Sequence, residues 1–153
     1  MTTTLSAQKN TARPVRTTAL AILFGLAACA PQPAIRSDGS PIVMPPEVLN
    51  TITAQQLARQ VAGECSRYTF NFGREQSEQR ALIPVVRASG LTERDLRLWA
   101  NNIPDDVQRD LQGRVIGFID EHDILMTDPD SFCAAGDTEV ADGSEIGSYL
   151  IAR

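Results

Sequence analysis

The sequence has little of what most enzyme sites are built on. It contains one His, His122, and three Cys, and these residues do not have the spacing of a zinc site. Neither a Walker loop, a GxGxxG fingerprint nor a GxSxG nucleophile turn is present. We therefore expect no metal and no cofactor, and the sequence singles out no catalytic residue.

The sequence also lacks an apolar run that could span a bilayer, which takes about 20 residues. Residues 17–28 are uncharged and mostly apolar, but this run is too short, and it follows Lys9, Arg13 and Arg16. A basic start, a short apolar run and small residues at its end are typical of a signal peptide. We expect residues 1–28 to direct export and to be removed.

The apolar run ends in Leu26-Ala27-Ala28-Cys29, which resembles the lipobox of bacterial lipoproteins. The resemblance implies cleavage before Cys29, a diacylglycerol thioether on its sulfur and an acyl chain such as palmitate on the new N-terminus. Ala30 would then be the second mature residue, and the absence of Asp there implies the outer membrane, on its periplasmic side. Because several acyl chains anchor a protein stably, we expect a domain held to the cell envelope by lipid.

Basic charge is scarce in the exported part of the chain. The three basic residues of the leader precede Cys29, which leaves eleven Arg and no Lys against nineteen acidic residues, a formal charge of about −8. A nucleic-acid partner requires a basic face, so we expect none. The same charge disfavours electrostatic docking on anionic lipid, and we attribute the absence of Lys to codon bias rather than to a binding site.

With Cys29 assigned to lipid, Cys65 and Cys133 are the two thiols that remain. Disulfides persist in oxidising compartments, and two thiols allow one intramolecular pairing. A reactive thiol or a metal ligand is the alternative, but neither Cys lies in a CxxC motif or beside a His. We predict a structural Cys65–Cys133 disulfide, whose loop of roughly 70 residues would stabilise the fold by about 4 kcal/mol.

Residues 29–48 have the composition of a tether. Five Pro residues and the turn-like stretch Ser37-Asp38-Gly39-Ser40 disfavour regular structure. Such a segment cannot bury enough apolar surface to offset its ordering entropy. We expect the lipidated Cys and a disordered linker over 29–48, which holds a single helical domain over 49–153 away from the bilayer.

The spacing of apolar residues after the tether predicts helices. The first would begin near Thr53 and carry Cys65 on its apolar face. The second would run from about Glu75 to Ser89, with a kink or a delayed start at Pro84. The stretch Tyr68–Phe72 fits either a short extended piece or a continuation of the first helix, and the sequence does not decide between them.

The next helix has the clearest start, because Thr92 is a suitable N-cap and Asp95 lies in the first turn. A longer helix would run from about Asp105 to His122, with a GxxxG pair, Gly113 and Gly117, that could allow close helix packing.

Further on, Phe132 and Cys133 would form a short helical turn that stops at Gly136, and Ser144 would cap a last helix that buries Tyr149. The expected fold is therefore all-α, a small bundle of about four to five helices with one disulfide, behind a signal peptide and a Pro-rich tether.

A succession of short motifs runs through the mature chain: Cys65, Phe70-Asn71, Gly90 to Leu96, Phe132 to Gly136, and Glu139 to Gly147. In this succession the chain resembles small exported alphaproteobacterial lipoproteins of uncharacterised families. Because the motifs are caps, helix stops and a cystine, the resemblance implies an all-helical, disulfide-bonded domain. It implies no activity.

Three features offer candidate chemistry. His122 lies on an apolar stripe, and we expect it to be packed and hydrogen-bonded rather than a ligand. Asp128, Asp130 and Glu139 occupy positions of a calcium-loop template, but apolar residues replace another ligand and the central Gly, which favours a solvated acidic loop. Trp99 is expected in the core, with stacking on a ligand as the alternative.

These observations favour a non-enzymatic interaction or structural module of the envelope, with an envelope protein as its partner. Surplus apolar surface on the two helices that begin near Thr92 and Asp105 would mark a docking face.

A periplasmic hydrolase using carboxylates or His122 is the alternative, and it requires a cleft with convergent polar groups. An envelope-stress chaperone, which would expose apolar surface on acidification, is a third. The sequence leaves the binding residues and the oligomeric state open.

Overall fold

The computed structural model describes residues 34–153, so the expected signal peptide and Cys29 lie outside the described residues. The described part of the chain is mostly helical and contains the Cys65–Cys133 disulfide, which confirms the expected fold class. Its elements follow in the order α1 (Pro46–Glu64), β1 (Tyr68–Phe70), α2 (Phe72–Ala88), α3 (Glu93–Asn101), α4 (Asp105–Glu121), α5 (Pro129–Asp142), α6 (Glu145–Ser148) and β2 (Leu150–Ala152).

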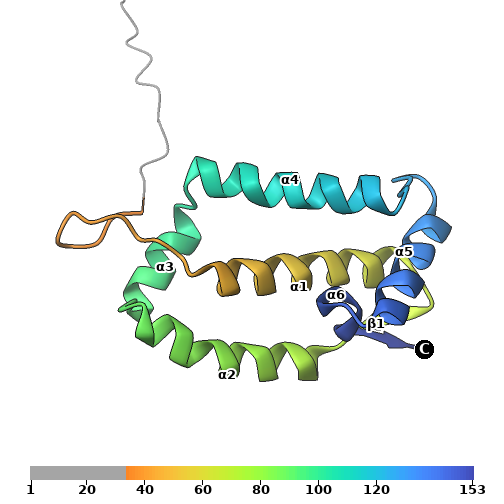
Figure 1. The fold of residues 1–153 in the computed structure, drawn as a ribbon, viewed down its shortest axis with the longest axis horizontal. Coiled ribbons are helices and arrows are strands. Elements are labelled where there is room, and N and C mark those ends of the chain that lie inside the picture. Colours follow the sequence, from red (N-terminus) through yellow and green to blue (C-terminus); the bar gives the residue numbers. More distant parts are fainter. Residues whose placement is uncertain (1–33) are drawn as a thin grey trace, which may run out of the picture.

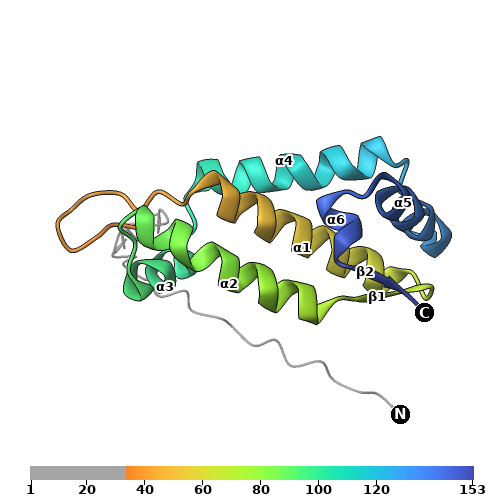
Figure 2. The ribbon, with the colours of Figure 1, turned by 60° about the horizontal axis from the view of Figure 1, so that its bottom comes forward.

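Helix α1 is the axis of the fold. Helices α2 and α4 run along its two sides, and α3 lies between them at one end (Figure 1). Helices α5 and α6 and the two strands gather at the other end. A view from a second direction shows the same order, with the loop of residues 34–45 at the α3 end (Figure 2). The domain is therefore a row of three long helices closed at both ends by shorter elements.

The end that carries the disulfide holds the larger core. Cys65 follows α1 and Cys133 lies in α5, and their Cα atoms are 5.0 Å apart. Tyr149 is completely buried, and its ring stacks on that of Phe70 with 5.8 Å between the centroids. The buried members of this cluster are Ala54, Leu57, Ala58, Val61, Cys65, Tyr68, Phe70, Phe118, Ile124, Phe132, Cys133, Ala135, Tyr149 and Leu150.

A second, smaller core lies at the α3 end. Its buried members are Ala34, Ile42, Met44, Val48, Leu91 and Trp99. Three of them precede α1, in the segment expected to be a tether. Fully burying a large apolar side chain contributes about 1.5–3 kcal/mol, which offsets part of the entropy lost when that segment becomes ordered.

The expected tether therefore differs from the structure over residues 34–48. Ile35 and Pro41 form an isolated antiparallel bridge, and the Ile42 N–H donates to the Ala34 carbonyl at 2.9 Å. Helix α1 begins at Pro46 rather than near Thr53, so the boundary expected after residue 48 falls inside it. Proline is suited to the first turn of a helix, where its missing N–H would be unpaired in any case. The Pro-rich, polar composition of this segment gave no indication that Ala34, Ile42 and Met44 would be buried against the domain.

The open question about Tyr68–Phe72 is resolved by a change of structure within it. Residues Tyr68–Phe70 form strand β1, and Phe72 begins α2. The Asn71 side chain accepts the Arg74 N–H at 3.0 Å and caps α2, which starts before the expected Glu75. Helix α2 then continues through Pro84 to Ala88.

The segment around Phe132 is a complete helix rather than the expected short turn. Helix α5 spans the 14 residues Pro129–Asp142, between the N-cap Asp128 and the C-cap Gly143. Gly143 has the left-handed φ of 65° typical of a helix stop. Gly136 lies inside this helix instead of ending it. The expected last helix is also shorter, because α6 has four residues and the chain then continues into β2.

The predicted start of α3 is confirmed. Thr92 and Asp95 form a capping box, in which each side chain accepts the backbone N–H of the other residue. Helix α4 occupies almost the predicted range, but a Cβ atom added to Gly113 or Gly117 would meet nothing within 4 Å. The GxxxG pair therefore makes no close helix contact in the described part of the chain.

Candidate functional site

The most concentrated group of buried polar side chains centres on Glu139 of α5. The His122 Nε2 atom lies 2.7 Å from Glu139 Oε1, and the Ser144 hydroxyl donates to the other carboxylate oxygen. The side chains of His122 and Glu139 are 8% and 11% exposed. The His122 ring also packs on Phe118, with 4.6 Å between the ring centroids. His122 is thus packed and hydrogen-bonded, as expected.

These three residues do not have the order of a hydrolase triad. In a triad, the His accepts the proton of the Ser nucleophile and is oriented by the carboxylate on its far side. Here the carboxylate of Glu139 lies between Ser144 and His122. The Ser144 Oγ atom also accepts the Gly147 N–H at 2.9 Å and so serves as the N-cap of α6. The group therefore joins the ends of α4, α5 and α6 and does not activate a nucleophile.

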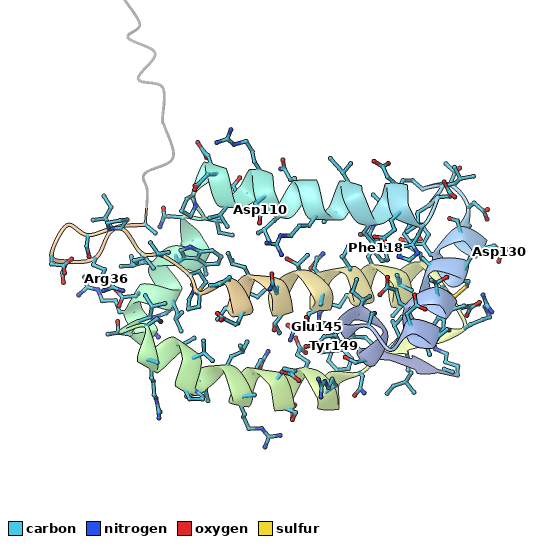
Figure 3. All side chains as sticks on the ribbon, viewed as in Figure 1. Arg36, Asp110, Phe118, Asp130, Glu145 and Tyr149 are labelled. Carbon is cyan, nitrogen blue, oxygen red and sulfur yellow. A yellow bond between two sulfur atoms is a disulfide. The ribbon has the colours of Figure 1, made fainter. Side chains whose placement is uncertain are left out.

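A cleft of about 330 Å³ lies beside this group, between α1, α4 and α6. Arg114 on its α4 side contacts Asp110 at 2.8 Å and Asn50 at 2.6 Å. Glu145 of α6, labelled in Figure 3, accepts a hydrogen bond from Thr51 of α1 at 3.1 Å. The charged groups of the cleft are therefore paired within the chain rather than directed at a common point. The lining residues are Asn50, Thr53, Ala54, Leu57, Arg114, Glu139, Ser144, Glu145 and Ile146.

A more apolar groove, of about 580 Å³, lies between α2 and α3. None of the 17 residues of α2 is buried. Leu82 and Val86 pack against the second core but stay partly exposed, so the domain does not fully cover the apolar side chains of this helix. Ile83, which lines the groove, is 45% exposed. The lining residues are Gln79, Leu82, Ile83, Val86, Arg87, Leu91, Thr92, Glu93 and Leu96.

Surplus apolar surface was expected on α3 and α4. The structure shows it on α4 and in the groove between α2 and α3. Helix α4 does carry a shallow hollow, lined by Leu111, Gln112, Val115 and Ile116, and Ile116 is 58% exposed. The groove that involves α2 was not foreseen. The only signal for it in the sequence is that the apolar residues of α2 are concentrated in one turn around Pro84, too few to bury a helix of this length.

The residues that matched a calcium-loop template do not come together. Asp128 caps the start of α5, where its side chain accepts the Asp130 N–H at 3.1 Å. Glu139 lies eleven residues further along, about 16 Å away at the rise of an α-helix. Across residues 34–153, no three His, Cys, Asp or Glu side chains lie close enough to hold a metal ion.

Trp99 lies in the core at the α3 end, with 5% of its surface exposed. Its ring packs in the same cluster as Ala34, Ile42 and Met44, and its Nε1 atom has no hydrogen-bond partner within the described residues. Because these residues cover it, Trp99 is a core residue and offers no open face for stacking on a ligand.

A hydrogen-bonded ion pair lies away from these hollows, between β1 and α5. The Tyr68 hydroxyl donates to Asp137 at 2.6 Å, and the Arg67 guanidinium lies 2.8 Å from the same carboxylate. The hydrogen bond from Tyr68, reinforced by Arg67, lowers the pKa of Asp137. The same hydrogen bond, together with burial, raises the pKa of Tyr68. The pair attaches α5 to the strand.

A sequence comparison supplies the family context. Residues 40–151 match the profile of DUF5333, described as a family of unknown function. No curated protein and no solved structure matches the chain. Among the helices of residues 34–153, none combines the length and the apolar character needed to cross a membrane.

Proposed function

The chain belongs to DUF5333, a family of unknown function, and we propose that it is a lipid-anchored envelope protein whose helical domain acts by binding. The lipobox-like Leu26–Cys29 sequence and the preceding signal-peptide pattern support the anchor, which is expected to lie in the outer membrane, facing the periplasm. The disulfide agrees with export, because disulfides persist outside the cytoplasm.

The observation that carries the binding role is the uncovered face of α2. The apolar residues of this helix are at most partly buried within the domain, so apolar surface is left for a partner. The groove that α2 forms with α3 has polar residues, Gln79, Arg87, Thr92 and Glu93, among its apolar lining. Apolar surface with polar residues at its margins is typical of a protein–protein contact. We propose that the groove receives an apolar segment of an envelope protein.

The hydrolase alternative has weaker support. The polar cleft contains Ser144 and Glu139, but the position of the carboxylate between Ser144 and His122 does not suit proton transfer from the hydroxyl to the imidazole. The third candidate is a chaperone role, which would use the same apolar groove as the binding role. It differs in requiring more exposed apolar surface at acidic pH.

Photo-crosslinking in intact cells tests the binding role. A crosslinking residue at Ile83 in the groove, 45% exposed, is compared with one at Val140 on α5, 44% exposed. We expect one defined envelope protein to attach at Ile83 and not at Val140. Equal or absent attachment at the two positions would contradict the proposal, and a broad, acid-enhanced set of products at Ile83 would favour the chaperone.

A further inference from the structure

The loop before α1 has two faces of different exposure. The Ile35–Pro41 bridge and the hydrogen bond between Arg36 and Ser40 turn the chain back on itself, so alternate residues face opposite sides. Ala34, Ile42 and Met44 are 3%, 3% and 6% exposed, whereas Ile35 and Val43 are 45% and 71% exposed, and Pro41 is also exposed. The outer face, defined as Ile35, Pro41 and Val43, is apolar and carries no charge.

The inner face fixes the loop to the domain. Its three buried residues belong to the same cluster as Trp99 of α3 and Val48 of α1. The loop therefore has a set orientation relative to the helices, at the α3 end of the molecule (Figure 2). The outer face therefore has a fixed position at that end of the domain.

The length of chain before Ala34 limits how far this face can lie from the proposed anchor. Five Cα–Cα steps separate Cys29 from Ala34, and a fully extended chain covers at most about 17 Å over that distance. Helix α1 alone, with 19 residues, is about 28 Å long. With Cys29 in the bilayer, Ala34 at the α3 end could lie at most about 17 Å from it, whereas the disulfide end would have no such limit.

We infer that the outer face of the loop, Ile35, Pro41 and Val43, rests in the interfacial region of the bilayer beside the lipidated Cys29. The inference rests on the lipid anchor proposed above. The lipid is the occupant that this geometry favours, because a membrane surface always lies within reach of the tether. An uncharged apolar face suits the lipid interface, whereas the acidic chain as a whole does not favour anionic headgroups.

The contact needs little intrinsic affinity. The lipid on Cys29 already retains the protein at the membrane, so a contact by the loop is an intramolecular second step at a high effective concentration. Its effect is to orient the domain. Leu91 of the α2–α3 groove belongs to the same buried cluster as the inner face of the loop, so the groove would lie at the end of the domain that is nearer the anchor.

The test uses the full lipidated chain in vesicles of phosphatidylethanolamine and phosphatidylglycerol with brominated acyl chains, which quench indole fluorescence on contact. Val43→Trp places a reporter in the outer face. Leu125→Trp is the matched control, because Leu125 is 62% exposed and lies at the disulfide end. Trp99 is present in both variants and provides the same background. The intact mass confirms the lipid on Cys29, and cosedimentation confirms attachment to vesicles.

We expect bromolipid to quench the reporter at position 43 at least twofold more than the reporter at position 125, and acrylamide to show the reverse order. Attached, lipidated protein with equal bromolipid quenching at both positions would overturn the membrane contact and leave the anchor standing. A reporter at position 43 shielded from both quenchers would also overturn it, in favour of a second copy or a protein partner. Absence of lipid on Cys29 would overturn both the contact and the anchor.

Discussion

Gly136 of α5 lies against Tyr68 of β1 so closely that a Cβ atom on the glycine would be 2.8 Å from the Tyr68 ring. The same Cβ atom would be 2.9 Å from a methyl group of Val61 in α1. Real Cβ atoms do not approach other atoms so closely. The missing side chain thus allows α5 to pack on α1 and β1, in the core that also contains the disulfide.

The first prediction concerns this contact. Gly136→Ala should lower the free energy of unfolding by about 1–3 kcal/mol, because the added methyl group forces neighbouring atoms apart in a packed core. Gly113→Ala is the control, since its Cβ atom would meet nothing within 4 Å and alanine favours the helix by up to about 1 kcal/mol. Urea unfolding measures both. If the two variants changed the free energy of unfolding in the same direction, the close approach of Gly136 to Tyr68 and Val61 would not account for the effect.

The disulfide gives a second prediction. Cys133→Ser should destabilise the domain by about 2–5 kcal/mol, as is usual for small secreted domains. Hydrogen exchange in the variant should rise first over residues 128–151, since the bridge attaches α5 to the end of α1. Helix α5 also buries Phe132 and Ala135, so we expect it to loosen without unfolding separately. If hydrogen exchange rose earlier in α3 and α4 than over residues 128–151, the disulfide would not act mainly by attaching α5 to α1.

The Tyr68–Asp137 pair predicts a dependence of stability on pH. The hydrogen bond from Tyr68 lowers the pKa of Asp137, so its stabilisation is present above about pH 4 and is lost as the pH falls through the lowered value. The raised pKa of Tyr68 means that its contribution is present below about pH 10 and is lost as the pH rises through the raised value.

Tyr68→Phe tests this dependence. At neutral pH it should cost about 1 kcal/mol of stability, a modest amount because Asp137 is partly exposed and solvent weakens the interaction. The difference from the unaltered protein should shrink once Asp137 is protonated. Tyr149→Phe is the control, because the Tyr149 hydroxyl bonds to Gln55 and not to a carboxylate. A constant difference between pH 3 and pH 7 for Tyr68→Phe would contradict the coupling.

The uneven burial predicts uneven native-state dynamics. Helix α1 contributes seven buried residues, whereas α2 contributes none. Amide hydrogen exchange should therefore be slowest around Ala58 and Val61 and distinctly faster along α2, since exchange reflects the cost of local opening. Equal protection of α1 and α2 in the isolated protein would mean that α2 is covered, for example by a second copy, and that its groove is closed.

Several parts of the fold could be predicted because their signals are local. The Thr92–Asp95 capping box depends on residues three apart, and its start of α3 was identified correctly. The Cys65–Cys133 pairing followed from the number of thiols and the inferred compartment. Gly136 was misinterpreted as a helix stop because its role depends on Tyr68, which is distant in sequence. Strand β1 likewise needed its partner β2, which is distant in sequence.

The candidate sites were harder to predict, because exposure is a property of the assembled helices. The burial of Ile42 and Met44 in the loop before α1 depends on the surface that Trp99 of α3 provides, which is distant in sequence. The groove beside Ile83 exists because the described chain covers the apolar residues of α2 only in part, which no local pattern reveals. The hydrogen-bonded state of His122 was foreseen from its apolar stripe, but its partner Glu139 lies on another helix.

The proposed lipid anchor on Cys29 underlies both the proposed role in the envelope and the proposed membrane contact of the loop. The most direct test is the intact mass of the mature protein, extracted with detergent from the membrane fraction of the cells that produce it. We predict a chain that begins at Cys29, carries a diacylglycerol group and an N-terminal acyl chain, and loses them both in Cys29→Ser. A chain of unmodified mass, or one that begins elsewhere, would contradict the account.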